Sequence, residues 1–138
     1  MGSADSDAIR VLCVEDLHFV AASICEDIDR EPGLRSVGIL PTPDNLLEET
    51  RRLQARVVLL DLRTGGRDSL EAMTELLRAM PEVRVIIVSG DNHPKMIERA
   101  FALGASGYVV KSEPREVVEA ARAVAEGRKW LPRHPLRQ

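Results

Sequence analysis

Residues 56–66 read RVVLLDLRTGG, in which the apolar run VVLL leads directly into Asp61 and a pair of glycines follows shortly after. A short, continuous apolar run bounded by turn-forming residues is typical of a β-strand that is buried on both faces. Strands of this kind occur in parallel sheets, whose two faces are covered by helices. The stretch therefore predicts a strand over 56–60 within a parallel sheet, with Asp61 at its carboxyl end.

Four further apolar-rich runs occur along the chain, at 9–14, 34–40, 83–88 and 106–110. Between several of them, apolar residues recur at the three- and four-residue spacing of amphipathic helices. The apolar residues of these helical patterns are Leu17, Val20, Ile24 and Ile28; Leu70, Met73, Leu77 and Met80; Met96, Ile97, Ala100 and Phe101; and Val117, Ala121 and Val124, the last three of which are expected to face inward.

Capping residues and helix breakers mark the expected helix ends. Asp44 is predicted to cap a further helix that runs to about Gln54, and Ser112 is predicted to cap the last helix. Pro81 stops the helix that precedes the fourth strand. Five strands then alternate with five helices. Because parallel neighbours need crossover connections, this alternation predicts an α/β fold with a five-stranded parallel sheet and helices on both faces.

The composition fits one globular domain. The chain has 138 residues, 44% of them hydrophobic and 30% charged, and a net charge of −3. An acidic balance argues against a domain that binds nucleic acid over a broad basic face. The apolar runs are far shorter than the ~20 residues that cross a bilayer, and the N-terminus lacks the pattern of a secretory signal. We therefore expect no membrane segment and a cytoplasmic location, with Cys13 and Cys25 as buried, reduced thiols.

Charge is unevenly distributed along the sequence. The last eleven residues hold four basic and no acidic side chains, so residues 1–127 carry a net charge of −7. We interpret residues 9–127 as the folded domain and 128–138 as a basic linker or tail. Residues 1–8 are interpreted as a disordered N-terminus or the remnant of an expression tag.

Polar residues follow four of the five predicted strands. Glu15 and Asp16 follow the first strand, Asp61 the third, Ser89 the fourth and Lys111 the fifth. Because ligands of parallel sheets bind at the carboxyl ends of the strands, we expect these side chains to converge. Clustered carboxylates repel one another unless a cation lies among them, and oxygen ligands with room for water suit Mg²⁺. A lysine and a hydroxyl opposite them match the needs of a phosphoryl group, which makes Asp61 a candidate nucleophile.

With these residues in place, the sequence resembles the receiver domains of two-component response regulators. The resemblance covers residues 9–127 and rests on VLCVED, VVLLDLR, VIIVSG and GASGYVVKS. It implies a flavodoxin-like (βα)5 receiver fold with strand order 2-1-3-4-5. It also implies a signalling domain that catalyses its own phosphorylation and dephosphorylation, rather than a metabolic enzyme.

The resemblance assigns a role to each polar residue. Asp61 is expected to accept a phosphoryl group from a phosphohistidine of a sensor histidine kinase, while Ser89 and Lys111 bind the phosphoryl oxygens. The expected Mg²⁺ ligands are Glu15, Asp16, Asp61 and the backbone carbonyl of Arg63.

The resemblance also implies a switch. Phosphorylation is expected to draw Ser89 toward Asp61 and let Tyr108 rotate, which changes the partner preference of the surface made by the fourth helix, fifth strand and fifth helix. Alternatively, Tyr108 packs at the sheet edge as an aromatic side chain and has no switching role. Formation of a homodimer on phosphorylation is a further implication.

Three departures from the family pattern have consequences. The stretch LRTGGRDSLEA, residues 62–72, lacks the usual proline after the phosphoacceptor, and its Gly65-Gly66 pair predicts a mobile loop. Arg63 and Asp91 stand where residues tune phosphoryl lifetime, and we expect either an ion-paired lid or two independent solvated side chains. Ser112 replaces a proline that commonly follows the lysine through a cis bond, so the isomer of the Lys111–Ser112 bond stays open.

The tail resembles the linker entry of regulators with a helix-turn-helix output domain. Residues 127–138 read GRKWLPRHPLRQ, and no output domain follows, so contact with DNA is expected only through a domain absent from this chain. The expected output is transcription for a truncated regulator and protein binding for a stand-alone receiver. Trp130 and Leu131 are alternatively expected to fold back onto the domain.

Three rival functions share this fold or chemistry. A flavodoxin-like electron carrier needs aromatic stacking and a phosphate loop after the first strand, which VLCVEDLH does not offer. An aspartyl-phosphate phosphatase also has an aspartate nucleophile at a strand end. That family has a second aspartate, its catalytic acid, two residues after the nucleophile, and here Arg63 occupies that position. A receiver-like interaction module that works without phosphorylation stays as the alternative.

Overall fold

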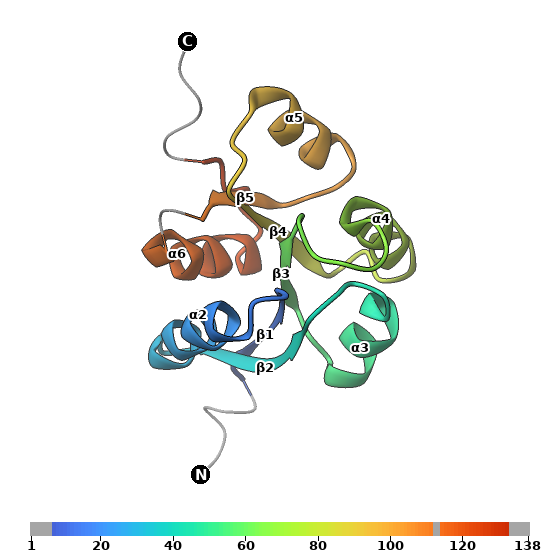
Figure 1. The fold of residues 1–138 in the computed structure, drawn as a ribbon. Helices are drawn as coiled ribbons and strands as arrows, with labels where there is room; N and C mark the ends of the chain where they lie inside the picture. Colours follow the sequence, from blue (N-terminus) through green and yellow to red (C-terminus); the bar gives the residue numbers. More distant parts are fainter. Residues whose placement is uncertain (1–6, 112–113, 133–138) are drawn as a thin grey trace.

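The computed structural model describes residues 7–111 and 114–132, which form one parallel sheet between two layers of helices (Figure 1). The sheet order is β2-β1-β3-β4-β5. The strands are β1 (Ile9–Val14), β2 (Leu34–Leu40), β3 (Val57–Asp61), β4 (Arg84–Ser89) and β5 (Gly107–Val110). The helices are α2 (His18–Arg30), α3 (Leu46–Leu53), α4 (Ser69–Ala79), α5 (Pro94–Ala102) and α6 (Pro114–Ala125). The predicted α/β fold and strand order 2-1-3-4-5 are confirmed.

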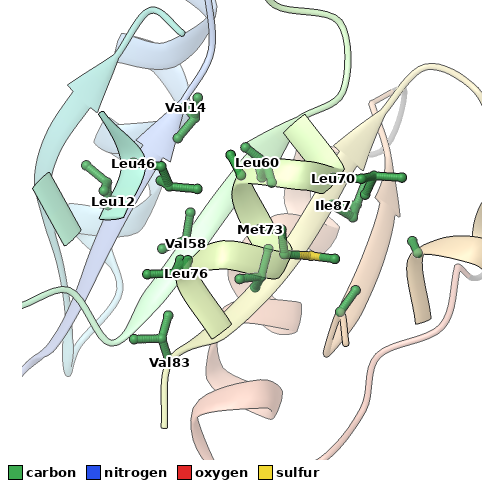
Figure 2. Close-up of a cluster of buried hydrophobic side chains, with 14 of the residues drawn as sticks. Leu12, Val14, Leu46, Val58, Leu60, Leu70, Met73, Leu76, Val83 and Ile87 are labelled. Carbon is green, nitrogen blue, oxygen red and sulfur yellow. The ribbon is translucent and has the colours of Figure 1, made fainter. Parts of the chain in front are cut away.

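Helices α2 and α6 cover one face of the sheet, and α3, α4 and α5 cover the other (Figure 1). Alternate residues of each strand point to opposite faces, so both layers receive apolar side chains from the same strands. In β3, Val58 and Leu60 pack toward α4, whereas Val57 and Leu59 pack toward α6. Figure 2 shows the first of these layers, in which Met73 and Leu76 of α4 meet the strand residues.

Strand β3 lies at the centre of the sheet, paired with β1 and β4. All five of its residues are buried, including Asp61. A strand whose two faces are both apolar needs helices on both sides, as at the centre of a parallel sheet. The VVLL run therefore identifies the central strand of this fold. Its last residue is therefore carried to the carboxyl edge of the sheet.

One local prediction is wrong. Asp44 does not cap α3, because the N-cap residue is Asn45 and no side chain caps that helix. The Asp44 carboxylate instead accepts the Arg67 amide N–H at 2.8 Å. Leu17, the first apolar residue of the first helical pattern, lies at the N-cap of α2 and is 51% exposed. The predicted Ser112 cap and the Lys111–Ser112 peptide bond involve a residue outside the described ranges.

The other sequence expectations are met in part. Both cysteines are free thiols, but only Cys13 is buried and Cys25 is half-buried. None of the helices within 7–111 and 114–132 combines the length and the apolar character needed to span a bilayer.

Candidate functional site

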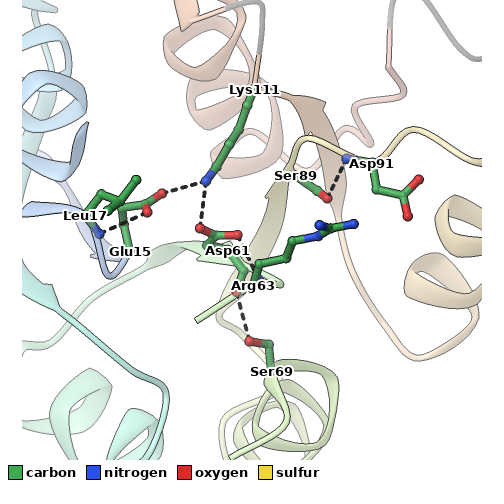
Figure 3. A network of polar contacts seen from close by, with 8 residues as sticks. All are labelled: Glu15, Leu17, Asp61, Arg63, Ser69, Ser89, Asp91 and Lys111. Atoms are coloured by element: carbon green, nitrogen blue, oxygen red, sulfur yellow. Dashed lines mark hydrogen bonds and ion pairs between the residues drawn. The ribbon is translucent and has the colours of Figure 1, made fainter. Parts of the chain in front are cut away.

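The predicted polar residues meet at the carboxyl edge of the sheet, as Figure 3 shows. Asp61 ends β3 and Ser89 ends β4, whereas Glu15 directly follows β1 and Lys111 directly follows β5. Four of the five strands therefore bring one of these side chains each to the same edge. The convergence expected from the order of strands and polar residues is present in the structure.

Lys111 bridges the two buried carboxylates. Its Nζ lies 2.8 Å from Asp61 Oδ2 and 3.1 Å from Glu15 Oε1. Glu15 and Asp61 are each 2% exposed, while the Lys111 side chain is 32% exposed. Buried charges are tolerated only when they are paired and hydrogen-bonded, and one ammonium compensates two carboxylates here. The cluster therefore keeps an excess of negative charge.

The acid–base properties follow from this geometry. Burial raises the pKa of Glu15, and the hydrogen bonds from the Leu17 amide and Lys111 only partly offset that effect. Burial opposes the charged form of Lys111, but its hydrogen bonds to Asp61 and Glu15 outweigh burial and raise the pKa of the amine. Lys111 is therefore positively charged throughout the neutral range.

A third carboxylate completes a set of oxygen donors. One carboxylate oxygen each of Glu15, Asp16 and Asp61 lies within 4.8 Å of the other two, and Asp16 is exposed. Three hard oxygen donors at this spacing, with one side open to water, fit a partly hydrated divalent cation such as Mg²⁺. Arg63 lies beside this set, since its amide N–H donates to Asp61 Oδ1 at 2.9 Å.

Ser89 and Tyr108 are linked through the loop after β4. The Asp91 amide N–H donates to Ser89 Oγ at 3.0 Å, and the Tyr108 hydroxyl donates to the Asp91 carbonyl oxygen. The Tyr108 side chain is fully buried, and this burial raises the pKa of its phenol. In this structure the tyrosine is therefore already packed inside the domain, next to the loop that begins at Ser89.

Arg63 and Asp91 do not form the ion pair of the predicted lid. The Arg63 guanidinium extends toward the side of the site where Asp91 lies (Figure 3), but no ion pair joins the two among the described residues. The Asp91 carboxylate instead accepts the His93 amide N–H at 2.9 Å. A local bond across two residues costs less ordering than a long-range pair between exposed side chains. Of the two arrangements expected for Arg63 and Asp91, this structure shows the one without an ion pair.

The loop after Asp61 is held by residues that the sequence did not single out for this purpose. Ser69 Oγ donates to the Asp61 carbonyl oxygen at 2.8 Å, and the Arg67 amide binds Asp44. Gly66 has φ +81°, and a Cβ there would lie 2.3 Å from Asp44 Oδ1. The loop predicted to be mobile from its glycines is thus fastened at both ends. In the sequence, the only sign of this fixed turn was the Gly65-Gly66 pair. Of the two glycines, only Gly66 has a backbone conformation that favours glycine.

Known proteins share this architecture. The family model described as "Response regulator receiver domain" matches residues 11–122. The chain is 33% identical over 124 residues to the response regulator GacA of Pseudomonas viridiflava, covering 89% of this chain and 58% of that protein. It is 29% identical over 124 residues to the response regulator UvrY of Escherichia coli (strain K12), covering 89% of this chain and 57% of UvrY. The chain therefore spans less than two thirds of the length of these relatives.

Solved structures agree with the sequence relatives. A two-component response regulator of the LuxR family from Aurantimonas sp. SI85-9A1 superposes with a TM-score of 0.84 at 28% identity, covering 89% of each chain. The non-phosphorylated receiver domain of the stress response regulator RcsB from Escherichia coli has a TM-score of 0.83 at 22% identity, covering 91% of this chain and 98% of that one. At that identity the second likeness shows a shared fold.

Proposed function

Because the chain belongs to the family of response regulator receiver domains, we propose that Asp61 is its phosphoacceptor and a sensor histidine kinase its phosphodonor. The observation that carries this proposal is the Lys111 ammonium, which lies within 3.1 Å of both Asp61 and Glu15 at the carboxyl edge of the sheet. A buried carboxylate held by a partly exposed cation is oriented for attack, and the cation is available to a second anion.

Transfer is a displacement at phosphorus. An Asp61 carboxylate oxygen forms a bond to phosphorus while the bond from phosphorus to the kinase histidine nitrogen breaks, and the electron pair of that bond stays on the imidazole. The product is an acyl phosphate on Asp61. Lys111 stabilises the phosphoryl oxygens, and Ser89 Oγ–H donates to one of them. Hydrolysis by water later breaks the acyl phosphate and restores the carboxylate.

We propose Mg²⁺ as the cofactor, held by the carboxylates of Glu15, Asp16 and Asp61 and by the Arg63 carbonyl oxygen. The support is the mutual spacing of the three carboxylate oxygens and the charge excess that Lys111 leaves uncompensated. When bound, the ion neutralises charge that develops on the transferring phosphoryl group. Arg63 and Asp91 flank the same site and are proposed to tune the lifetime of the acyl phosphate.

The approach of the kinase has a physical basis beside Lys111. A groove of about 400 Å³ between α2 and α6 is lined by Val20, Ile24, Val88 and Lys111, among others. At its rim Leu17 and Phe19 are 51% and 74% exposed. Large exposed apolar side chains next to a reactive group suit a transient protein contact. We place the kinase there, with its phosphohistidine facing Asp61.

The proposed output passes through Ser89 and Tyr108 to the face made by α5, β5 and α6. Phosphorylation that attracts Ser89 Oγ alters the loop bond from the Asp91 amide, and with it the environment of Tyr108. We further propose that this face forms a homodimer and controls transcription in the cytoplasm. The stretch at 127–132, which resembles the entry to a helix-turn-helix output domain, supports the transcriptional role.

Intact mass after incubation with a small-molecule phosphodonor tests the proposal without the kinase. We expect one phosphoryl group on the wild-type protein with Mg²⁺, none in the presence of a chelator and none on Asp61→Asn. Asp7→Asn is a matched control, because Asp7 is exposed and precedes β1, at the end of the sheet opposite the proposed site. A folded wild-type protein that gains no phosphoryl group would favour a phosphorylation-independent interaction module instead.

A further inference from the structure

The segment Arg128–Leu131, here called the strap, follows α6 and lies along the open edge of β5. Trp130 forms an isolated parallel bridge with Gly107 of β5. Its amide N–H donates to the Ser106 carbonyl at 3.0 Å, and its carbonyl accepts the Tyr108 amide N–H at 3.0 Å. An edge strand offers unpaired backbone groups to any approaching chain. In this structure the strap takes those positions.

The strap also contacts both helices beside β5. The Trp130 indole N–H donates to Glu116 Oε2 of α6 at 2.7 Å, and Glu116 is only 4% exposed. The Lys129 ammonium lies 5.8 Å from the centre of the Phe101 ring on α5, within the range of a cation–π contact. A segment of four residues thus contacts α5, β5 and α6, the three elements of the proposed output face.

The sequence of β5 leaves room for this contact. A Cβ on Gly107 would lie 3.2 Å from Trp130 Cβ and 3.2 Å from Ile86 Cγ1. Such distances are tighter than ordinary van der Waals contact, so a side chain at 107 would push the strap away. The absence of a side chain at Gly107 and the indole bond to Glu116 together indicate a built docking position for Trp130.

A series of hydrogen bonds joins the strap to the phosphorylation site. Ser89 Oγ accepts from the Asp91 amide, the Asp91 carbonyl accepts from the Tyr108 hydroxyl, and the Tyr108 amide donates to Trp130. Tyr108 is common to both ends, because its side chain contacts the loop after β4 and its backbone contacts the strap. A shift of this residue therefore changes both contacts.

We propose that the strap is an intramolecular occupant of the α5–β5–α6 face and that phosphorylation of Asp61 releases it. The inference rests on the proposed function. When Ser89 Oγ moves toward a phosphoryl oxygen to donate its O–H, it moves away from the Asp91 amide, and the loop that holds the Tyr108 hydroxyl rearranges. The β5 backbone at Tyr108 then no longer matches the strap. The strap leaves and the edge of β5 becomes accessible.

Trp130 provides the measurement, because it is the only tryptophan in the chain. Its fluorescence is recorded on the full chain before and after reaction with a small-molecule phosphodonor and Mg²⁺, with intact mass measured on the same sample. We expect a red shift of the emission and an increase in acrylamide quenching on phosphorylation, because the indole moves from Glu116 into water. Neither change is expected for Asp61→Asn treated in the same way.

Two variants test the docking itself. Gly107→Ala should shift the emission of the unphosphorylated protein toward that of the phosphorylated one, whereas Gly65→Ala should not, since a Cβ at Gly65 has no neighbour within 4 Å. Glu116→Gln should weaken docking, and the reciprocity of coupled equilibria then predicts several-fold tighter binding of the phosphoryl mimic beryllofluoride. Glu98→Gln, an exposed change on α5, is the control. Circular dichroism checks that each variant is folded.

The outcomes separate this inference from the proposed function. Phosphoryl uptake with a red-shifted, more quenchable Trp130 supports the release of the strap. Uptake by mass with an unchanged emission spectrum would overturn the strap proposal and leave the phosphoacceptor role intact. A protein that gains no phosphoryl group would overturn both.

Discussion

The bodies of the central strands bury apolar side chains, whereas their carboxyl ends bury ionisable ones. In β3, Val57 to Leu60 are apolar and buried in the two helical layers, and Asp61, the next residue, is equally buried but ionisable. The same change occurs from Val14 to Glu15 at the end of β1. Apolar burial contributes the stability of the domain, whereas a buried carboxylate opposes it unless a cation is near. The strand bodies therefore support the fold, and their ends carry the chemistry.

The largest effect on stability is expected in the strand-body layer. Met73→Ala removes a fully buried side chain of α4 and should lower the free energy of unfolding by about 2–5 kcal/mol. Phosphoryl uptake by the folded fraction should persist, because Met73 belongs to the apolar cluster beneath α4 and supplies no group to the proposed chemistry. Urea unfolding followed by intact mass checks both statements. Phe19→Ala, at a position 74% exposed, should change stability by less than about 0.5 kcal/mol.

Loss of the cation should destabilise the strand ends. Lys111→Met leaves Glu15 and Asp61 facing each other and should lower stability at neutral pH by about 1–3 kcal/mol, less than for a fully enclosed pair because the lysine is partly exposed. Mg²⁺ should restore more stability to this variant than to the wild type, since the ion compensates the same carboxylates. Thermal unfolding with and without Mg²⁺ measures the difference. An equal response of both proteins would argue against a shared cation site.

In the loop that follows Asp61, substitution of Gly66 should lower the stability of the domain, whereas substitution of its neighbour Gly65 should not. Gly66→Ala places a Cβ against Asp44 in a left-handed backbone conformation and should cost about 1–2 kcal/mol. Gly65→Ala should be nearly neutral, because no atom lies within 4 Å of its Cβ. Chemical unfolding of the two variants side by side tests the assignment. Equal losses of stability in the two variants would mean that the contact with Asp44 does not fix the conformation of the loop.

The smallest effect concerns pH. Because the pKa of Glu15 is raised in the folded state, the folded protein binds more protons than the unfolded chain between the usual glutamate range and the raised pKa. Stability should therefore fall as pH rises through that window in metal-free buffer. Glu15→Gln should flatten this slope, while Glu26→Gln, with a side chain 70% exposed, should not. Unfolding of the three proteins is measured from pH 4 to pH 8 with a chelator present. A steeper fall of stability with pH in Glu15→Gln than in the wild type would contradict a raised pKa of Glu15.

The sequence predicted the strands well because their signal is local. The run at 34–40 coincides with β2, and the residues placed after each strand reach the same edge, since parallel topology requires it. What the sequence does not decide is the choice between hydrogen-bond partners. Asp44 was predicted to cap a helix but accepts the Arg67 amide N–H. Asp91 was left with two alternatives, and its carboxylate accepts the His93 amide N–H. A single side chain offers the same oxygens to local and distant donors, and the sequence does not rank them.

The strap illustrates the same limit. A basic tail with one tryptophan is compatible with a linker or with a return to the domain. The choice depends on the space at Gly107 and on the Glu116 carboxylate, both supplied by other elements. Neither feature has a periodicity that sequence analysis detects, so the strap is visible only once β5 and α6 are side by side.

The most direct test of the central claim identifies the residue that carries the phosphoryl group. Borohydride reduces an acyl phosphate to the alcohol with loss of phosphate, and thus converts a phosphorylated aspartate into homoserine, which peptide mass spectrometry locates. After reaction with a phosphodonor and Mg²⁺, we predict homoserine at position 61 and at no other aspartate. Homoserine at Asp16 or Asp91, or an unmodified Asp61 in a protein that has gained a phosphoryl group, would contradict the account.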